Sequence, residues 1–216
     1  MDGTEPTSLD DARLRAALGV LARADADLAR ALDRIGYPAP RQREPGFATL
    51  IQIIAAQQVS TASAAAICRK LAVAMGGEVT PDGLLTLDDA AMRAAGFSRP
   101  KAAYARGLAQ ALLAGELDLP SLQHLEEEAA IASLTRLKGF GRWSAEIYLL
   151  FAHGRVDVFP ADDLAVQIAY QRLKRLEARP AGKALRFLAE PWRPFRGAAA
   201  VFLWHYYGAA TLDGSP

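Results

Sequence analysis

The stretch LKGFGRWSA, from Leu137 to Ala145, places two glycines around one aromatic residue between two segments of helical pattern. Apolar residues recur at helical spacing before and after it, which predicts two helices joined by a tight connection. Glycine costs a helix interior roughly 1 kcal/mol relative to alanine, so Gly139 and Gly141 are typical of such a connection. This part of the chain therefore predicts a helical hairpin.

Two uses of this hairpin fit its residues. Without β-carbons at Gly139 and Gly141, backbone N–H groups can approach a surface closely. They adjoin the start of the second helix, where unpaired N–H groups favour an anion such as a phosphate. An ordinary turn between helices, with Phe140 in the core, explains the same residues. The local pattern leaves both interpretations open.

The composition predicts an all-α fold. We expect a single domain over residues 1–216, built either as one large core or as two small lobes that share an interface. Of these residues 51% are hydrophobic, alanine and leucine abound, and no segment reads as a strand. Ten segments carry a helical pattern. We expect helices at residues 9–35, 47–56, 61–75, 87–95, 99–113, 122–137, 142–152, 163–176, 181–188 and 191–207.

Charge and cysteine content exclude several classes of protein. The 25 Lys and Arg residues nearly balance the 24 Asp and Glu residues, so a polyanionic partner must be held locally. The single cysteine, Cys68, excludes an internal disulfide and a four-cysteine metal cluster within this chain. The polar, acidic start predicts no secretory signal peptide, and glutamines and hydroxyl residues interrupt the uncharged run 45–68, which we interpret as buried helices.

Five segments together resemble one protein family. Leu137–Ala145 is similar to the helix-hairpin-helix motif that grips a DNA backbone without reading its sequence. VDVFPADDLAVQ, residues 156–167, resembles the glycine, proline and aspartate segment of the helix-hairpin-helix DNA glycosylases (HhH-GPD superfamily). LIQIIAAQQVSTASA, GFSRPKAAYARGLA and PWRPFRGAAAVFLWHYYG resemble the 3-methyladenine DNA glycosylase II branch in order and spacing. The resemblance runs from about Phe47 to Tyr207.

This resemblance implies a two-lobed helical fold with the active site in a cleft between the lobes. The chain looks like the compact form of the family, without the N-terminal α+β domain of the bacterial glycosylase II type. One lobe is expected at about residues 47–160, with the hairpin 137–145. The other lobe is expected from segment 8–46 together with helices in 161–207.

The resemblance makes Asp163 the catalytic carboxylate. The pair Asp162 and Asp163 follows Pro160, and we expect Asp162 to be the N-cap of a helix with Asp163 in its first turn. A carboxylate near a helix N-terminus is stabilised electrostatically. Hydrolysis of an N-glycosidic bond builds positive charge on the sugar, which a fixed anion stabilises.

Aromatic residues are expected to form the base pocket. The resemblance points to Trp143 and Trp204, with Tyr148 and Leu164 beside them, although a tryptophan on a helical face is usually a core residue. Electron-rich rings attract a base that carries positive charge, such as an alkylated purine. The family has a tyrosine after the catalytic aspartate, whereas this chain has Leu164, so the range of accepted bases stays open.

Other positions carry further roles by resemblance. Gln58 aligns with the residue that fills the stack after a base is extruded; a glutamine that satisfies helix-end carbonyls is the alternative. Phosphate contacts are expected from Gly139, Gly141, Arg142, Ser144 and Lys101. Arg99 is a weaker candidate for such a contact. Arg196 is predicted equally as an ion-pair partner near Asp163 or as a DNA contact.

No cofactor is expected to be required. By resemblance, main-chain carbonyls of Thr135, Leu137 and Phe140 hold a structural Na⁺ or K⁺, which the residue types alone do not show. Bifunctional members carry a lysine directly after the Gly-x-Gly-x string, where this chain has Trp143. No lyase activity is therefore expected.

Together these features predict a monofunctional DNA glycosylase that removes alkylated purines such as 3-methyladenine and 7-methylguanine from double-stranded DNA. The alternatives are a non-catalytic DNA-binding module and a glycosylase for mispaired or oxidised bases. We expect a monomer without membrane attachment in a bacterial cytoplasm, associated with the nucleoid when it acts.

Overall fold

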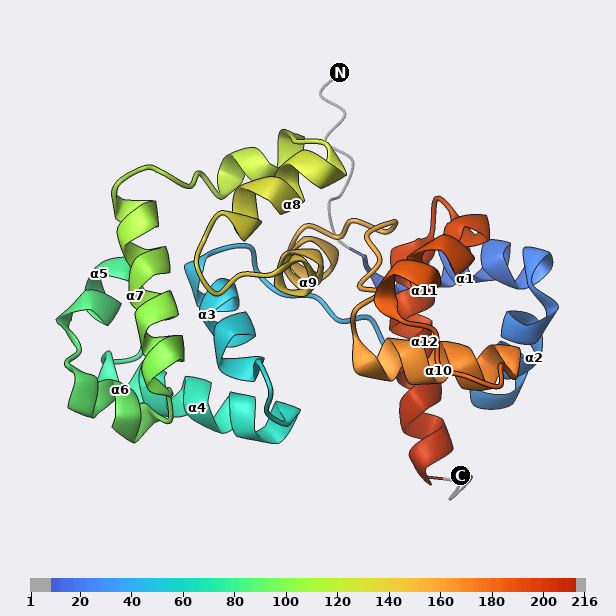
Figure 1. Ribbon diagram of the computed structural model, residues 1–216, viewed down its shortest axis with the longest axis horizontal. Helices are drawn as coiled ribbons and strands as arrows, with labels where there is room; N and C mark the ends of the chain where they lie inside the picture. Colours follow the sequence, from blue (N-terminus) through green and yellow to red (C-terminus); the bar gives the residue numbers. More distant parts are fainter. Residues whose placement is uncertain (1–8, 213–216) are drawn as a thin grey trace. The chain divides into compact units, whose positions relative to one another are not determined.

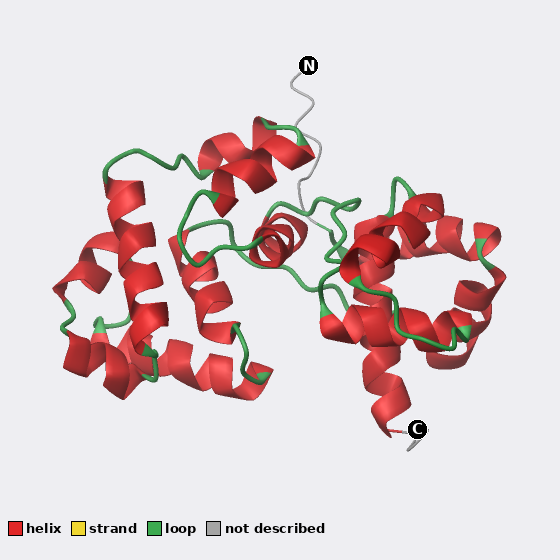
Figure 2. Cartoon of the chain, viewed as in Figure 1, coloured by secondary structure: helices red, strands yellow, loops and turns green. Residues whose placement is uncertain are grey.

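The computed structural model describes residues 9–212, and within this range every regular element is a helix (Figure 2). The all-α prediction is confirmed. The chain divides into two compact units, one running to Gln42 and resuming at Leu149, the other comprising Arg43–Tyr148. The division falls inside one helix, Arg142–Ala152, whereas the sequence placed it near residue 160.

The first unit is organised around its last helix. Its helices are α1 (Asp11–Ala24), α2 (Ala26–Ile35), α10 (Leu164–Lys174), α11 (Gly182–Leu188) and α12 (Arg196–Leu212), with a 3₁₀ turn η2 (Glu190–Trp192). From Ala198 to Leu203 every residue of α12 is buried, because α1, α2 and α10 all pack against it (Figure 1). A helix that is apolar on all sides is stable only in such a central place.

The second unit packs around α3 and α7. Its helices are α3 (Phe47–Ala56), α4 (Thr61–Ala74), α5 (Pro81–Thr86), α6 (Asp89–Ala95), α7 (Arg99–Leu113) and α8 (Glu127–Thr135), with a 3₁₀ turn η1 (Pro120–His124) and the start of α9 (Arg142–Ala152). α3 packs on α4 and α7, and α7 also contacts α5 and α6 (Figure 1). All the large apolar residues of α3 are buried, which anchors the turn that follows it.

The expected helix over residues 9–35 is instead two helices. Asp25 adopts an extended conformation between them, with φ of −133°, and its carboxylate accepts hydrogen bonds from the N–H groups of Asp27 and Leu28 as N-cap of α2. The apolar period continues across this break, so periodicity alone did not reveal it. In the sequence, Ser8 followed by Asp11 is a capping signal for this helix. Ser8 lies outside the described residues, and Asp10 caps α1.

One missed helix and two helix starts also differ from the sequence prediction. The short helix α5 was missed, because its six residues give little periodic signal. The helix expected over 122–137 begins only at Glu127, after η1. The helix expected over 191–207 begins at Arg196, because Pro191 and Pro194 confine the preceding residues to η2 and a turn. Among the described residues, no helix is long and apolar enough to cross a membrane.

Candidate active site

Asp163 lies immediately before the first turn of α10 and is its N-cap. Its Oδ1 accepts a hydrogen bond from the Val166 N–H group over 3.1 Å. The prediction that Asp162 would be the N-cap is therefore wrong by one residue. Asp162 is exposed and pairs instead with Arg186, over 3.4 Å. The carboxylate expected to carry the chemistry is thus also the group that starts the helix.

Trp204 fixes the same carboxylate from α12. Its indole Nε1 donates to Asp163 Oδ1 over 3.0 Å, and its ring lies 5.5 Å from the Phe151 ring, centroid to centroid. Both tryptophan and aspartate are half-buried, which protects the bond from water without closing the site. The sequence assigned Trp204 only to base stacking, so its role as a donor was missed.

The segment that leads to Asp163 is held at its start by the first turn of α12. The N–H groups of Gly197 and Ala198 donate to the Val156 carbonyl over 2.7 and 3.2 Å. A β-carbon at Gly197 would lie 2.7 Å from that oxygen and 2.8 Å from the Val158 carbonyl oxygen. Only glycine allows this close approach of backbone to backbone.

Arg196 holds the same segment through ion pairs. Its buried guanidinium donates to both carboxylate oxygens of Asp157, over 3.0 and 2.8 Å, and to Glu190 over 2.9 Å. This arrangement selects the structural alternative for Arg196 over a DNA contact, because the donors are directed at neighbouring carboxylates within the first unit. Arg196 thus positions the segment leading to Asp163.

The end of the segment is held by α11. Arg186 donates to the Phe159 carbonyl over 3.0 Å, and Gly182 leaves room for Asp162, whose Oδ1 would lie 1.8 Å from a β-carbon there. Leu164, the residue after Asp163, is 57% exposed. An apolar side chain this exposed beside the carboxylate is available to a substrate.

The hairpin of the second unit runs from α8 to α9, and its two glycines differ. Gly139 has φ of +90°, and a β-carbon there would lie 2.2 Å from Cγ of Tyr104, so the fold itself requires glycine. A β-carbon at Gly141 would meet nothing within 4 Å. Gly141 is exposed, so the fold itself does not require glycine here, and only a molecule bound at this surface could require it.

Arg142 has intramolecular partners that the sequence did not predict. Its guanidinium forms a bidentate pair with Glu128 of α8, and its Nε donates to the buried Glu146 over 2.9 Å. The hydrogen bond with Glu128 is the largest influence on the pKa of Arg142 and raises it, against the effect of burial. These pairs fasten α8 to α9, and the phosphate contact expected of this side chain stays a prediction.

The Gln57–Ser60 segment between α3 and α4 places Gln58 at an exposed tip. Gln58 has φ of +58°, one of two non-glycine residues in the left-handed region among the described residues. Such a conformation costs on the order of 1 kcal/mol or more and persists only where the surroundings enforce it. The backbone is thus held in an unfavourable state at the position predicted to enter the DNA stack.

Lys101 contacts this turn rather than solvent. Its Nζ donates to the carbonyl oxygens of Ala55 and Gln57, over 2.8 and 2.7 Å, and burial lowers its pKa below the ordinary value. The sequence did not predict this contact with the end of α3, and the phosphate contact expected of Lys101 stays a prediction. Gln57, which the sequence did not single out, donates from Nε2 to the Gly139 carbonyl over 2.9 Å.

The remaining predicted site residues of the second unit lie on α9. Trp143 is half-buried. Ser144 is buried, with its hydroxyl 3.4 Å from Gln57 Nε2, so only its backbone could meet a phosphate. Tyr148 is fully buried and its hydroxyl accepts a hydrogen bond from the Gly46 N–H group over 3.0 Å, which is the placement of a core residue rather than of a pocket wall.

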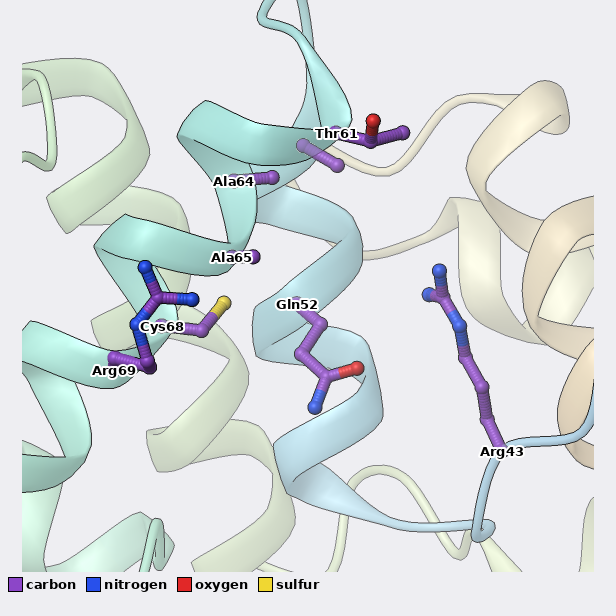
Figure 3. A pocket seen from close by; sticks show the side chains of 8 residues that line it. Arg43, Gln52, Thr61, Ala64, Ala65, Cys68 and Arg69 are labelled. Carbon is purple, nitrogen blue, oxygen red and sulfur yellow. The ribbon is translucent and has the colours of Figure 1, made fainter.

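A separate pocket of about 340 Å³ lies between α3 and α4 in the second unit (Figure 3). In Figure 3, Gln52 of α3 lies between Cys68 and Arg69 of α4 on one side and Arg43 on the other. Burial raises the pKa of the Cys68 thiol, which favours its protonated form. None of the predicted site residues lines this pocket.

A protein family and several known proteins are similar to this chain. A family model described as HhH-GPD superfamily base excision DNA repair protein matches residues 51–194. DNA-3-methyladenine glycosylase 1 of Schizosaccharomyces pombe is 36% identical over 76% of this chain and 72% of its own length. DNA-3-methyladenine glycosylase 2 of Escherichia coli is 29% identical over 82% of this chain and 65% of its own.

A solved structure shares the fold. It is the Schizosaccharomyces pombe 3-methyladenine DNA glycosylase in complex with abasic DNA, which matches with a TM-score of 0.83 and 30% identity. The match covers 93% of this chain and 99% of that one. With the family model matching 144 of 216 residues, 51–194, the chain belongs to the HhH-GPD superfamily of base excision DNA repair proteins.

Proposed function

We propose that the protein is a monofunctional DNA glycosylase that hydrolyses the N-glycosidic bond of alkylated purines in base-excision repair. The observation that carries this proposal is the carboxylate of Asp163, held by the Val166 N–H group and the Trp204 indole. A module that only binds DNA has no use for a carboxylate oriented beside an aromatic ring. The relatives named 3-methyladenine glycosylases support the substrate class.

Asp163 would act on the sugar. As the bond from C1′ to the base nitrogen breaks, positive charge develops on the sugar, and a fixed carboxylate stabilises that charge in the transition state. Water then forms the new bond to C1′ and loses a proton. A purine methylated at N3 or N7 already carries positive charge and leaves as a neutral base, so no general acid is needed.

Recognition of such a base would use charge and shape. Trp204 presents its indole edge to Asp163, and Leu164 beside it is exposed. Trp143 offers a second indole on α9. Cation–π attraction to an indole is worth about 1–2 kcal/mol, which favours a positively charged base such as 3-methyladenine or 7-methylguanine over an unmodified one.

The DNA backbone would be held by amides of the hairpin. Gly141 is exposed and has space around it, which suits close approach of a phosphate to the start of α9. Gln58 would fill the space left by the extruded base. The ion pairs of Arg142 and the backbone contacts of Lys101 leave the main-chain amides as the principal phosphate ligands that we propose.

A monovalent cation at the hairpin is part of this proposal. The carbonyls of Thr135, Leu137 and Phe140 would hold it. The Leu137 carbonyl accepts one hydrogen bond, from the Phe140 N–H group over 3.0 Å, and a carbonyl oxygen has a second lone pair for a cation. The cation would bring positive charge near the phosphate. We further propose that the protein acts as a monomer on DNA in a bacterial cytoplasm.

Mass spectrometry of released bases tests the activity. Genomic DNA treated with a methylating agent is incubated with the wild type or with Asp163→Asn, and the low-molecular-mass fraction is analysed. Free 3-methyladenine and 7-methylguanine from the wild type alone are expected. Release of only mispaired or oxidised bases would change the substrate class, and no release of any base would leave a DNA-binding module.

A further inference from the structure

The contact between Lys101 and the turn after α3 fixes one particular peptide group. Nζ of Lys101, on the first turn of α7, lies 2.7 Å from the Gln57 carbonyl oxygen and 2.8 Å from that of Ala55. The Gln57 oxygen belongs to the peptide that joins Gln57 to Gln58. Its direction therefore sets the backbone angles on both sides of that peptide.

Those angles define the turn. Gln57 has φ of −57° and ψ of 125°, Gln58 has φ of +58°, and the Val59 N–H group donates to the Ala56 carbonyl over 3.4 Å. This combination describes a type II turn, in which the third residue needs a positive φ and is usually glycine or asparagine. A type I turn differs by a flip of the central peptide. The flip reverses the direction of its carbonyl group and brings φ of the third residue back to a negative value, which removes the strain there.

Nothing within the turn favours type II, because Gln58 is neither glycine nor asparagine. In the type I alternative the Gln57 carbonyl would turn away from Lys101, and the hydrogen bond over 2.7 Å would be lost. A hydrogen bond from a charged donor is among the stronger ones in proteins. Lys101 is thus the group that opposes the flip.

Gln57 is tied to the hairpin as well. Its Nε2 donates to the Gly139 carbonyl over 2.9 Å and lies 3.4 Å from the Ser144 hydroxyl oxygen. The two sides of the turn are therefore held by different elements. α7 holds its backbone through Lys101, and the hairpin holds its first side chain.

We propose that Lys101 is a positioning residue for base extrusion, which acts by holding the turn at Gln57 and Gln58 in its type II form. The inference rests on the proposed function, in which Gln58 enters the vacated stack. With the peptide held, Gln58 projects in one direction before DNA arrives, so no binding energy is spent on ordering the turn. Lys101 contacts protein rather than phosphate in this role.

A double-mutant cycle tests the proposal. Lys101→Met, Gln58→Ala and the double variant are compared in single-turnover excision of a methylated purine from a fully paired duplex and from a site opposite a mismatch. Lys101→Met is expected to slow excision from the paired duplex on the order of tenfold. This factor corresponds to the free-energy cost of holding a non-glycine residue in the left-handed conformation, which the variant would no longer enforce. In the Gln58→Ala background, Lys101→Met should slow excision little further, because the side chain through which Lys101 acts has already been removed.

The control is Arg99→Met, which removes the same charge two positions earlier on α7 without touching the turn. Arg99→Met should leave unchanged the ratio of the excision rates from the paired duplex and from the mismatched site. The salt dependence of affinity separates the two roles of Lys101. A phosphate contact would contribute about 0.9 to the slope of log affinity against log salt, whereas a positioning residue contributes nothing.

Three results would overturn the proposal: additive losses in the double variant, equal losses on both substrates, or a reduced salt slope for Lys101→Met. Where Lys101→Met does not fold, Lys101→Gln keeps a donor without the charge and serves in the same cycle. A readout without catalysis is the fluorescence of 2-aminopurine next to an abasic-site analogue, which rises when the wedge enters. A wild type that inserts the wedge but releases no base would refute the proposed function and leave the role of Lys101 standing.

Discussion

Trp204 donates its indole N–H to Oδ1 of Asp163 over 3.0 Å, across 41 positions of sequence. The same oxygen accepts the Val166 N–H group of the α10 cap, so two donors converge on it. The carboxylate therefore has a fixed direction before any substrate binds. This preorganisation is what electrostatic stabilisation of a transition state requires.

Asp163→Asn should remove activity and preserve the fold. Asparagine is about as good an N-cap as aspartate and can still accept from Val166, so only the charge is lost. We expect single-turnover release of 3-methyladenine to slow by at least about a hundredfold, equivalent to ~3 kcal/mol of barrier. Affinity for abasic-site DNA should hold. Asp162→Asn is the control; a larger loss in that variant would mean that the other aspartate carries the chemistry.

Trp204→Phe should reduce the rate constant more than it reduces substrate binding. The change keeps an aromatic ring beside Phe151 and deletes the donor to Asp163. A hydrogen bond to a charged group is worth about 1.5–3 kcal/mol, so a loss of roughly tenfold or more in excision rate is expected. Full activity of this variant would show that the indole N–H group is dispensable.

Trp192→Phe is the matched control for Trp204→Phe. Trp192 makes the same kind of bond, from Nε1 to Asp25 Oδ2 over 2.8 Å, but within a structural cluster of the first unit. Its loss should lower the midpoint of thermal unfolding and leave the excision rate of the folded protein unchanged. The two variants together separate orientation of the carboxylate from general packing.

The two hairpin glycines should respond differently to substitution. Gly139→Ala should destabilise the protein by about 2–4 kcal/mol, because its β-carbon would overlap Tyr104 and its φ is +90°. Gly141→Val should change stability by no more than about 1 kcal/mol and weaken binding to damaged and undamaged duplexes alike. Urea unfolding and duplex titrations measure the two effects. Unchanged affinity of Gly141→Val would remove the hairpin from the DNA interface.

Borohydride should trap no covalent complex with abasic DNA. Trp143 occupies the position after Gly141 and Arg142 at which the bifunctional relatives carry a lysine, and an indole forms no Schiff base. Strands should therefore break only after later alkali treatment. The measurement is denaturing electrophoresis of enzyme, DNA and borohydride mixtures. A trapped band at ordinary enzyme concentrations would contradict the monofunctional assignment.

The cluster of Asp25, Lys174 and Trp192 should make stability depend on pH. Burial alone raises the pKa of Asp25, but hydrogen bonds from Lys174 and Trp192 outweigh burial and leave the pKa below its ordinary value of 3.8. Because the folded-state pKa is depressed, the stabilisation is present above pH 3.8 and is lost as pH falls through the lower value.

Lys174→Met measures this contribution. Nζ of Lys174 lies 2.6 and 2.7 Å from the two oxygens of Asp25, so its removal should cost about 2 kcal/mol at neutral pH. The difference from the wild type should shrink in urea unfolding at acidic pH, where Asp25 is protonated. A difference that stays constant down to pH values well below 3.8 would show that packing of the lysine, not its charge, stabilises the cluster.

The sequence by itself determined the helical class, the hairpin at Gly139 and Gly141, and the family. These features are local: helical periodicity needs only neighbouring residues, and glycine permits a turn wherever it stands. The same local reasoning placed Asp163 at the start of a helix. It erred by one residue in the cap because Asp162 and Asp163 have equal intrinsic preference for that position.

Only the tertiary structure shows which acceptors of their own chain the charged side chains contact. Lys101, Arg142 and Arg196 all carry charges that suit a phosphate, yet each donates to oxygens of its own chain. The partners of Lys101 lie 44 and 46 residues away, and the Asp157 partner of Arg196 lies 39 residues away. A long, flexible cationic side chain has no local signature that separates a carboxylate or carbonyl of its own fold from a phosphate of DNA. Folding alone brings the competing acceptors within reach.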